Sequence, residues 1–179
     1  MTHPAVFLDR DGVINRAFVR NGTPYPPASL RDLEILAHVP EALGALKAQG
    51  YSLVVVTNQP DVARGAASRE LVDSIHERLK SELLLDAIFT CFHDDADECD
   101  CRKPKPGLLL QAAHDLGIDL KSSFMVGDRW RDVEAGRRAG CRTLFVDCGY
   151  REAPSHSCDF RVGSLLEASG IILAESDSR

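Results

Sequence analysis

The sequence has no apolar run long enough to cross a membrane. Its apolar runs, such as 53–56 and 83–85, are far too short, since a helix that spans a bilayer needs about 20 apolar residues. The first residues also lack a basic stretch followed by an apolar segment, so we expect no signal peptide and a cytoplasmic protein. Because cysteines stay reduced in the cytoplasm, the six cysteines are interpreted as metal ligands or core residues rather than as disulfides.

The chain also lacks an excess of positive charge. Its 21 lysines and arginines are outnumbered by 27 aspartates and glutamates, which leaves a formal net charge of -6. A protein that binds nucleic acid without regard to sequence, or an anionic membrane surface, needs a positively charged surface. We therefore expect neither kind of partner.

Repeats, low-complexity tracts and linkers are absent as well. With 179 residues the chain is long enough for one domain with a real core and short for two. We expect a single domain over residues 1–179, with a polar tail that frays from about residue 174.

Short apolar runs alternate with helical patterns along the chain. One predicted helix begins at Ser68, a favourable N-cap residue, and places Leu71, Ile75 and Leu79 on one face. Strand–helix alternation at this spacing predicts an α/β fold with a doubly wound parallel sheet. The predicted strands are residues 5–8, 52–56, 87–91, 124–126, 143–146 and 160–162, and the predicted helices include 40–49, 106–116, 132–139 and a short helix after 162.

Two stretches interrupt the alternation. Arg16 to Asp32 is a long connection that contains the sequence NGTPYPP, and a loop of this length in a compact domain is usually functional or disordered. Phe92 to Lys105 carries most of a cluster of cysteine and histidine residues.

Polar side chains follow the predicted strands, at the point where each strand ends. In doubly wound folds, ligands bind beyond the carboxyl ends of the strands. We therefore expect these residues to converge at one edge of the sheet, although each of them alone is an ordinary turn, cap or surface residue. They are Asp9, Asp11, Thr57, Asn58, Lys103, Asp128 and Asp132.

This combination of residue types suits phosphoryl transfer. A carboxylate such as Asp9 can attack phosphorus and form an aspartyl-phosphate. A second acid two residues later, Asp11, can protonate the leaving oxygen and then activate water. Mg²⁺ prefers hard oxygen ligands, which Asp9 and Asp128 can supply, and Lys103 together with the metal can neutralise the charge of the transferring group.

The motifs resemble those of a known family. VFLDRDGVIN, VVVTNQ, CRKPKPG and MVGDRWRDVEAG resemble the four motifs of the haloacid dehalogenase superfamily of phosphatases. They look most like the branch that includes histidinol-phosphate phosphatase and D-glycero-D-manno-heptose 1,7-bisphosphate phosphatase. The resemblance extends from about Val6 to Gly149 and implies a Rossmann-like core without a large cap domain.

The resemblance also implies roles for single residues. It makes Asp9 the nucleophile and Asp11 the acid/base, and it implies that the carboxylate of Asp9, the main-chain carbonyl of Asp11 and the carboxylate of Asp128 bind Mg²⁺. The other matches are Thr57 and Asn58 for holding the phosphate, Lys103 for balancing charge, and Asp132 just outside the direct ligands of the metal.

The cysteine and histidine residues form a pattern of their own within residues 91–101. Three thiolates and one imidazole make a closed tetrahedral set for Zn²⁺, although this spacing differs from that of common zinc fingers. The same branch of the superfamily carries a zinc loop just before its motif lysine, which implies a structural zinc held by Cys91, His93, Cys99 and Cys101. Cys141, Cys148 and Cys158 lie outside the pattern and are interpreted as packing residues.

The substrate is harder to predict than the reaction. Arg64, Arg102 and Arg129 are candidates for binding a second phosphate or a polar substrate body, since guanidinium groups match phosphate oxygens. The sequence VARG around Arg64 resembles the heptose enzymes, whereas the short gap in the zinc loop resembles the histidinol enzymes. Pro60, Asp61 and the NGTPYPP segment depart from typical heptose enzymes.

We predict a monomeric, magnesium-dependent phosphatase that acts on a small phosphorylated metabolite, with heptose 1,7-bisphosphate favoured as substrate. The second phosphate of a bisphosphate requires fixed positive charge, which the three arginines can supply. Histidinol phosphate is the alternative, because the acidic segment Asp94 to Asp100 could meet its cationic amine. A non-catalytic zinc-stabilised binding protein and a phospho-accepting receiver domain are further alternatives, but neither requires an acid/base at Asp11.

Overall fold

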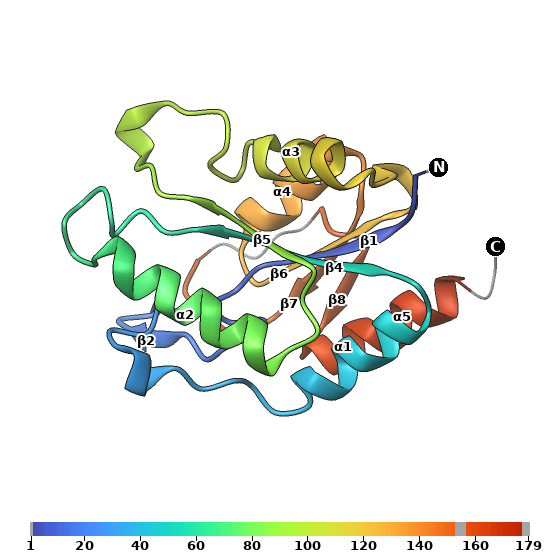
Figure 1. The fold of residues 1–179 in the computed structure, drawn as a ribbon, viewed down its shortest axis with the longest axis horizontal. Helices are drawn as coiled ribbons and strands as arrows, with labels where there is room; N and C mark the ends of the chain where they lie inside the picture. The colour runs from blue at the N-terminus through green and yellow to red at the C-terminus, as the bar shows by residue number, and fades with distance from the viewer. Residues whose placement is uncertain (1, 153–156, 177–179) are drawn as a thin grey trace.

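The computed structural model describes residues 2–152 and 157–176, which form a parallel sheet between two layers of helices (Figure 1). The sheet has six strands in the order β5-β4-β1-β6-β7-β8. Every pairing in it is parallel, as the strand–helix alternation predicts. The strands are β1 (Ala5–Leu8), β4 (Ser52–Asn58), β5 (Ala87–Cys91), β6 (Phe124–Gly127), β7 (Arg142–Val146) and β8 (Phe160–Val162).

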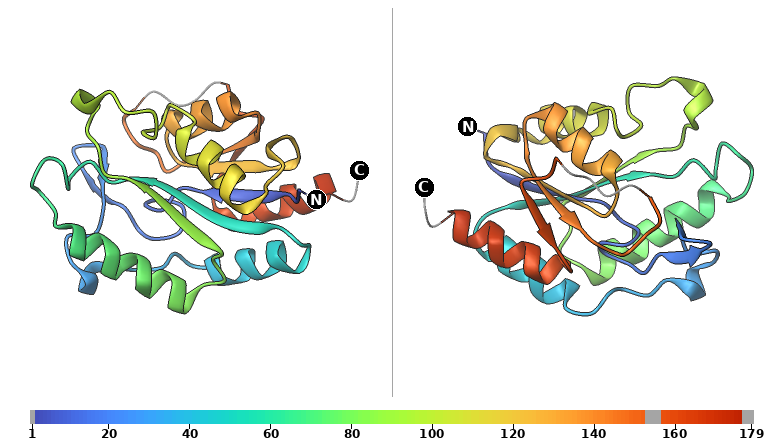
Figure 2. Two further views of the ribbon diagram at one scale, coloured as in Figure 1. Left: turned by 45° about the horizontal axis from the view of Figure 1, so that its top comes forward. Right: turned by 180° about the vertical axis from the view of Figure 1, so that it is seen from behind.

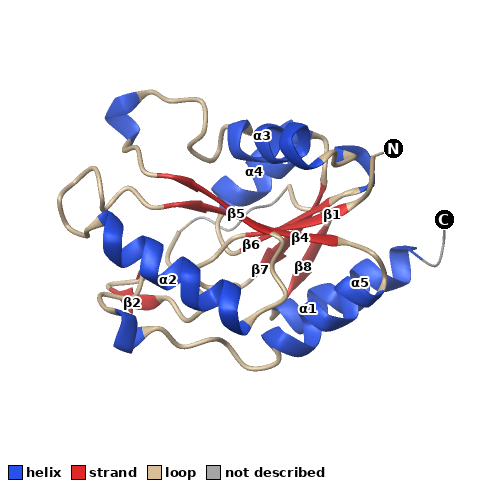
Figure 3. Cartoon of the chain, viewed as in Figure 1, coloured by secondary structure: helices blue, strands red, loops and turns tan. Residues whose placement is uncertain are grey.

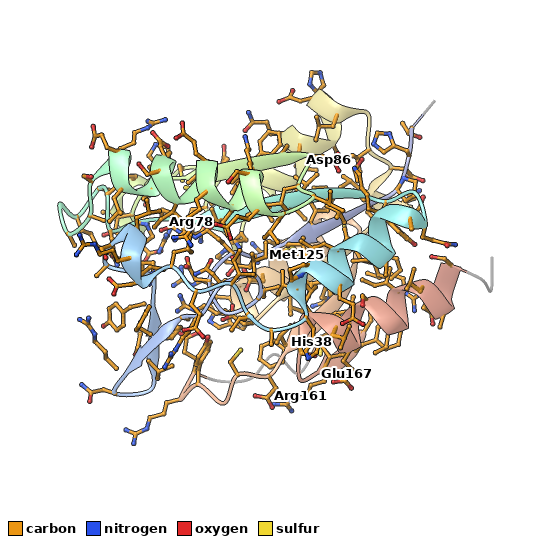
Figure 4. The ribbon with its side chains drawn as sticks, turned by 60° about the horizontal axis from the view of Figure 1, so that its bottom comes forward. His38, Arg78, Asp86, Met125, Arg161 and Glu167 are labelled. Atoms are coloured by element: carbon orange, nitrogen blue, oxygen red, sulfur yellow. The ribbon has the colours of Figure 1, made fainter. Side chains whose placement is uncertain are left out.

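Helices cover both faces of the sheet, and each layer has its own apolar core (Figure 2). One layer contains α1 (Val39–Ala48), α2 (Arg69–Glu82) and α5 (Leu165–Ser176), and the other contains α3 (Gly107–Leu116) and α4 (Trp130–Ala139). The central strand β1 is completely buried, because it alternates side chains between the two cores. Figure 4 shows Met125 of β6 inside the molecule, whereas His38 and Glu167 lie at the surface.

The predicted elements are present, with differences at their ends. The side chain of Ser68 accepts a hydrogen bond from the Leu71 backbone N–H and caps α2, as expected. Strand β4 runs two residues further than predicted, so Thr57 and Asn58 are its last residues rather than the start of the following loop. The last helix is longer than expected as well.

The expected fraying from residue 174 is wrong for residues 174–176, which belong to α5. The hydroxyl of Ser176 bonds to the carbonyl of Ile172 and to the hydroxyl of Tyr51, and these bonds attach the end of the helix to the core. Residues 177–179 lie outside the described part of the chain. No helix within the described residues is long and apolar enough to cross a membrane.

The long connection between Arg16 and Asp32 contains a β-hairpin and, at its end, the short 3-10 helix η1 (Leu30–Asp32) (Figure 3). Strands β2 (Phe18–Arg20) and β3 (Thr23–Tyr25) pair antiparallel around Asn21 and Gly22, whose φ angles of 52° and 81° are both positive. An Asn-Gly pair is the strongest short-range signal for such a turn. The signal was therefore present in the NGTPYPP sequence, although the connection was expected to be an irregular loop.

Candidate active site

The carboxyl ends of two neighbouring strands, β1 and β6, bring the predicted acidic residues together. Asp9 directly follows β1, and Asp128 directly follows β6. Asp132 lies in the first turn of α4, and its carboxylate and those of Asp9 and Asp128 lie within 4.8 Å of one another. All three residues are buried, so they form a compact cluster of negative charge inside the sheet edge.

Lys103 lies inside this cluster and is itself 1% exposed. Its Nζ is 2.6 Å from an oxygen of Asp9 and 2.6 Å from an oxygen of Asp132, and it donates to the carbonyl of Val56 at 2.7 Å. Burial by itself lowers the pKa of Lys103, but the charges of Asp132 and Asp9 outweigh that effect and raise the pKa above its ordinary value. The lysine is therefore charged at neutral pH.

Asn58 fixes the backbone of this lysine. Its side-chain Nδ2 donates to the Lys103 carbonyl at 3.0 Å, and its Oδ1 accepts from the Lys103 N–H at 3.1 Å. Both polar atoms of the Asn58 side chain are thus used within the protein. On the preceding residue of β4, the Thr57 hydroxyl accepts a hydrogen bond from Gln59 at 2.9 Å.

The residues of the carboxylate cluster fit a hard divalent cation. Both carboxylate oxygens of Asp128 are buried and have no hydrogen-bond partner of good geometry among the described residues, although the nearby Tyr150 hydroxyl lowers the pKa of Asp128 slightly. Burial, followed by the charges of Asp9 and Asp132, raises the pKa of Asp128 well above its ordinary value. Burial likewise raises the pKa of Asp9 to about 6, despite the neighbouring Lys103. A cation of the Mg²⁺ type would relieve this repulsion and supply the missing partner of Asp128.

Gly12 lets the loop after β1 approach Asp128. Its φ angle is +92°, and a Cβ atom at this position would lie 1.9 Å from an Asp128 carboxylate oxygen. The backbone between Asp11 and Asp128 can therefore come this close only with glycine at position 12.

Asp11 is held by residues that sequence reasoning did not single out. Its carboxylate accepts hydrogen bonds from Arg10, from Asn15 at 2.9 Å and from Gln59 at 2.9 Å. Arg10 and Gln59 lie inside the two motifs that contain Asp9 and Thr57, so their positions were a signal that could have found them. His76 of α2, which binds Arg10, has no such signal.

A cavity of about 260 Å³ opens above the cluster. The three predicted arginines, Arg64, Arg102 and Arg129, all line it together with Asp9 and Asp11, and Thr57 and Asn58 contribute to its wall. Sequence reasoning missed two parts of this wall. They are Arg131 of α4 and the segment Thr23, Pro24, Tyr25 and Pro26 of the β2–β3 hairpin.

Acidic partners orient the arginines of the cavity. Arg64 binds Asp94 through two nitrogens, and Arg102 binds Asp95 at 2.8 Å. Arg131 shares Asp95 at 3.0 Å. Arg129 pairs with Glu152. The acids of the 94–100 segment that point to this cavity are therefore already paired with arginines.

The four predicted zinc ligands lie together as well. The Sγ atoms of Cys91 and Cys99 are 3.7 Å apart, that of Cys101 lies 3.0 Å and 3.5 Å from them, and His93 Nδ1 lies 3.3 Å from the Sγ of Cys101. All four ligand atoms lie within 4.8 Å of one another. Two thiolates bound to one tetrahedral zinc at about 2.3 Å would be separated by about 3.8 Å, so the donor set fits this ion.

Comparison with known proteins identifies the family. The HAD-hydrolase-like family matches residues 100–167. A D-glycero-beta-D-manno-heptose-1,7-bisphosphate 7-phosphatase from Photorhabdus laumondii is 42% identical over 148 residues, which cover 76% of this chain and 76% of the relative. The chain belongs to the haloacid dehalogenase-like phosphatases. The enzyme of the same name from Escherichia coli K12 is 38% identical to this chain over 179 residues, which cover 92% of this chain and 91% of that protein.

A solved structure of this phosphatase family supports the same conclusion. The D,D-heptose 1,7-bisphosphate phosphatase of B. bronchiseptica, complexed with magnesium and phosphate, superposes with a TM-score of 0.82 at 28% identity. The match covers 96% of this chain and 99% of the other. The predicted doubly wound sheet without a large cap is therefore confirmed, and the chain is a phosphatase.

Proposed function

We propose that this phosphatase removes one phosphate from D-glycero-β-D-manno-heptose 1,7-bisphosphate. The observation that carries the proposal is the cavity that Asp9 lines together with four arginines. The nucleophile takes one phosphate of the substrate, and the arginines supply fixed positive charge for the other. The names of the relatives, which specify the 7-phosphatase of this sugar, favour the 7-phosphate as the one removed.

The proposed reaction has two steps at Asp9. In the first, the Asp9 carboxylate attacks phosphorus, Asp11 gives a proton to the leaving sugar oxygen, and the P–O bond to the sugar breaks. In the second, Asp11 takes a proton from water while the water oxygen attacks phosphorus, which frees Asp9 and orthophosphate. Lys103, bound to Asp9 at 2.6 Å, balances the charge of the transferring group.

Mg²⁺ is the proposed cofactor, with Asp9, the carbonyl of Asp11 and Asp128 as protein ligands. When bound, it would neutralise phosphate charge and position the phosphoryl group for attack. Thr57 would bind the phosphate through its hydroxyl. Since the side chain of Asn58 is bound to Lys103, a phosphate contact of Asn58 would use its main chain.

Zn²⁺ is proposed as a structural ion at Cys91, His93, Cys99 and Cys101. No ligand position would remain open for chemistry in a four-coordinate site. The chain passes from Cys101 directly into Arg102 and Lys103. A bound zinc would therefore fix the approach of both residues to the cavity.

Histidinol phosphate is less well matched to this cavity. Its cationic amine needs an unpaired acid, whereas Asp94 and Asp95 are ion-paired with arginines. The matched test compares kcat/KM for the heptose bisphosphate and for histidinol phosphate, and then repeats both with Arg64→Ala and Arg102→Ala. We expect the bisphosphate to be preferred, and each variant to lose about tenfold or more in kcat/KM for the bisphosphate alone. Faster hydrolysis of histidinol phosphate would remove the sugar assignment and leave the phosphatase intact.

The nucleophile is tested separately. Asp9→Asn should abolish turnover, because an amide cannot form the aspartyl-phosphate. Asp11→Asn is the matched variant. It should slow both formation and hydrolysis of the aspartyl-phosphate, but it keeps Asp9 as the nucleophile. Full activity of a folded Asp9→Asn protein would contradict the mechanism.

A further inference from the structure

The hydrogen bonds of Asp11 suit one of its two proposed roles. Arg10 donates to both of its oxygens, with Nη2 at 3.1 Å and 2.9 Å and Nε at 3.2 Å. Asn15 Nδ2 donates to Oδ1 and Gln59 Nε2 donates to Oδ2. Every one of these partners donates, so both oxygens of Asp11 are held as acceptors. This geometry suits the role in which Asp11 receives a proton from water.

The side chain of Arg10 that imposes this geometry is fully buried. Its Nη1 lies 3.1 Å from Nε2 of His76, on the inner face of α2. Because a guanidinium can only donate, His76 accepts through Nε2 and carries its proton on Nδ1. Burial first, and the charge of Arg10 second, lower the pKa of His76 to about 4, so this neutral form persists at neutral pH.

His76 is needed at this position because Arg10 cannot reach water. A buried N–H that loses its acceptor carries its full desolvation cost, so the guanidinium would shift to recover a partner. Such a shift would break the hydrogen bonds from Arg10 Nε and Nη2 to the two oxygens of Asp11. Neither Arg10 nor His76 lines the cavity, so any effect on the reaction passes through Asp11.

We propose that His76 and Arg10 form a positioning pair that holds Asp11 as the general base for hydrolysis of the aspartyl-phosphate. The inference rests on the proposed two-step mechanism. In the hydrolysis step the water oxygen forms a bond to phosphorus and its proton passes to Asp11. The bond between phosphorus and the Asp9 oxygen breaks, its electron pair returns to the Asp9 carboxylate, and orthophosphate leaves.

Kinetics can separate this role from a purely structural one. The ratio kcat/KM reports formation of the aspartyl-phosphate, whereas kcat also contains its hydrolysis. A variant that slows only hydrolysis lowers kcat and KM together and keeps their ratio. A variant that merely loosens the fold disturbs both steps and accumulates no phosphoenzyme.

The test compares His76→Asn with His76→Gln in the magnesium- and zinc-loaded enzyme. The amide oxygen of glutamine reaches about as far as Nε2 and can accept from Arg10, whereas that of asparagine is shorter by one bond and cannot. Glu77→Gln, at an exposed neighbour on α2, controls for substitution in this helix. The substrate is 4-nitrophenyl phosphate, whose release is followed by stopped flow, and the phosphoenzyme is trapped with acid.

For His76→Asn we expect kcat and KM to fall together by about tenfold or more, with kcat/KM unchanged within about twofold. A burst of nitrophenol near one equivalent per site and a trapped phosphoenzyme should accompany this change. His76→Gln should restore kcat to within about threefold of the parent enzyme. Should the asparagine variant fail to fold, as seen in its circular dichroism melting curve, His76→Met removes the acceptor with a side chain of similar length.

Two results would overturn the proposal. One is a parallel fall of kcat and kcat/KM without trapped phosphoenzyme, and the other is identical behaviour of the asparagine and glutamine variants. A failure of the proposed function looks different, because the parent enzyme itself would then form no phosphoenzyme that depends on Asp9.

Discussion

At the scale of single residues, the proposed catalytic centre is built from groups that repel one another. Of the three buried carboxylates, those of Asp9 and Asp132 share one lysine, and that of Asp128 has no hydrogen-bond partner of good geometry among the described residues. Burying charge without a partner costs free energy. The folded protein without a bound cation is therefore less stable than it would be without this cluster, as is common where function requires strain.

Asp128→Asn should make the metal-free protein more stable. Because the pKa of Asp128 is raised in the folded state, its ionisation destabilises that state as pH rises above the ordinary pKa of an aspartate. We expect the variant to gain about 1–2 kcal/mol in the free energy of unfolding at pH 7.5 without Mg²⁺. Urea denaturation of zinc-loaded protein measures this change.

The same variant should lose its response to the metal. Mg²⁺ should raise the melting temperature of the parent protein but not that of Asp128→Asn, and turnover should be lost. Asp73→Asn, at an exposed aspartate, is the control and should alter neither quantity. A variant that is less stable than the parent without Mg²⁺ would contradict this account of the cluster.

His76 should contribute a pH dependence to stability. Burial lowers its pKa to about 4, whereas the unfolded chain has the ordinary value of about 6.5. Between these pH values His76 is protonated in the unfolded chain and neutral in the folded protein. The free energy of unfolding should therefore fall as pH falls through this window, by up to about 1.4 kcal/mol per pH unit, with no contribution above pH 6.5.

His76→Gln tests this effect because glutamine does not titrate. Urea denaturation at pH 7, 6 and 5 should show the parent losing stability relative to the variant as pH falls, while other titrating groups cancel in the comparison. His114→Gln, at an exposed histidine, controls for the loss of an imidazole. A constant difference between parent and His76→Gln across this range would show that His76 titrates alike in both states.

At the scale of elements, the loop from Cys91 to Cys101 carries two functions in one segment. Its cysteines and histidine form the proposed zinc site, and its acids Asp94 and Asp95 hold arginines of the cavity. From the sequence these acids were considered as partners of a cationic substrate. Their ion pairs show another use, and the pair of Asp94 with Arg64 arises from a contact between segments 30 residues apart that no local pattern encodes.

Cys99→Ser should weaken zinc binding and destabilise the loop from Cys91 to Cys101. Losing one of four ligands should reduce zinc content, which is near one equivalent per chain in the proposed holoenzyme, and should lower the melting temperature by several degrees. KM for the bisphosphate should rise, because Arg64 and Arg102 lose their fixed partners. Elemental analysis and a melting curve measure the first two effects.

Asp100→Asn is the matched control in the same loop. The Asp100 side chain is 98% exposed and belongs to no proposed site, so its substitution should leave zinc content and melting temperature unchanged. Absence of zinc in carefully purified parent protein would remove the structural-zinc proposal and leave the phosphatase fold untouched.

At the scale of the whole molecule, we predict a monomer. Within the described residues, the exposed large apolar side chains come from different elements, such as Val19 of β2, Leu110 of α3 and Trp130 of α4. Stable dimers usually bury a continuous apolar patch. Light scattering coupled to size exclusion should give the mass of one chain at micromolar concentration, and a mass of two chains would contradict this prediction.

Most of the fold could be predicted from the sequence, because parallel strands and amphipathic helices have periodic patterns. The site residues Asp9, Asp11, Lys103 and Asp128 could be named because each belongs to a motif after a strand. His76 and Arg131 could not, since their importance comes from tertiary contacts between distant segments, whereas Arg10 lies inside the first motif and was overlooked. The hairpin at Phe18–Tyr25 was missed although its Asn-Gly turn was visible, which makes it an error of interpretation rather than a limit of the sequence.

The contact between Gly12 and Asp128 has a consequence for how this enzyme can diversify. In a library of random substitutions under selection for phosphatase activity, position 12 should be as intolerant as position 9, although glycine has no side chain with which to react. Alanine would already place its methyl group 1.9 Å from a carboxylate oxygen. The strictness of such a position would record the shape of the proposed metal site rather than its chemistry, because a change at 128 that made room would itself remove a proposed metal ligand.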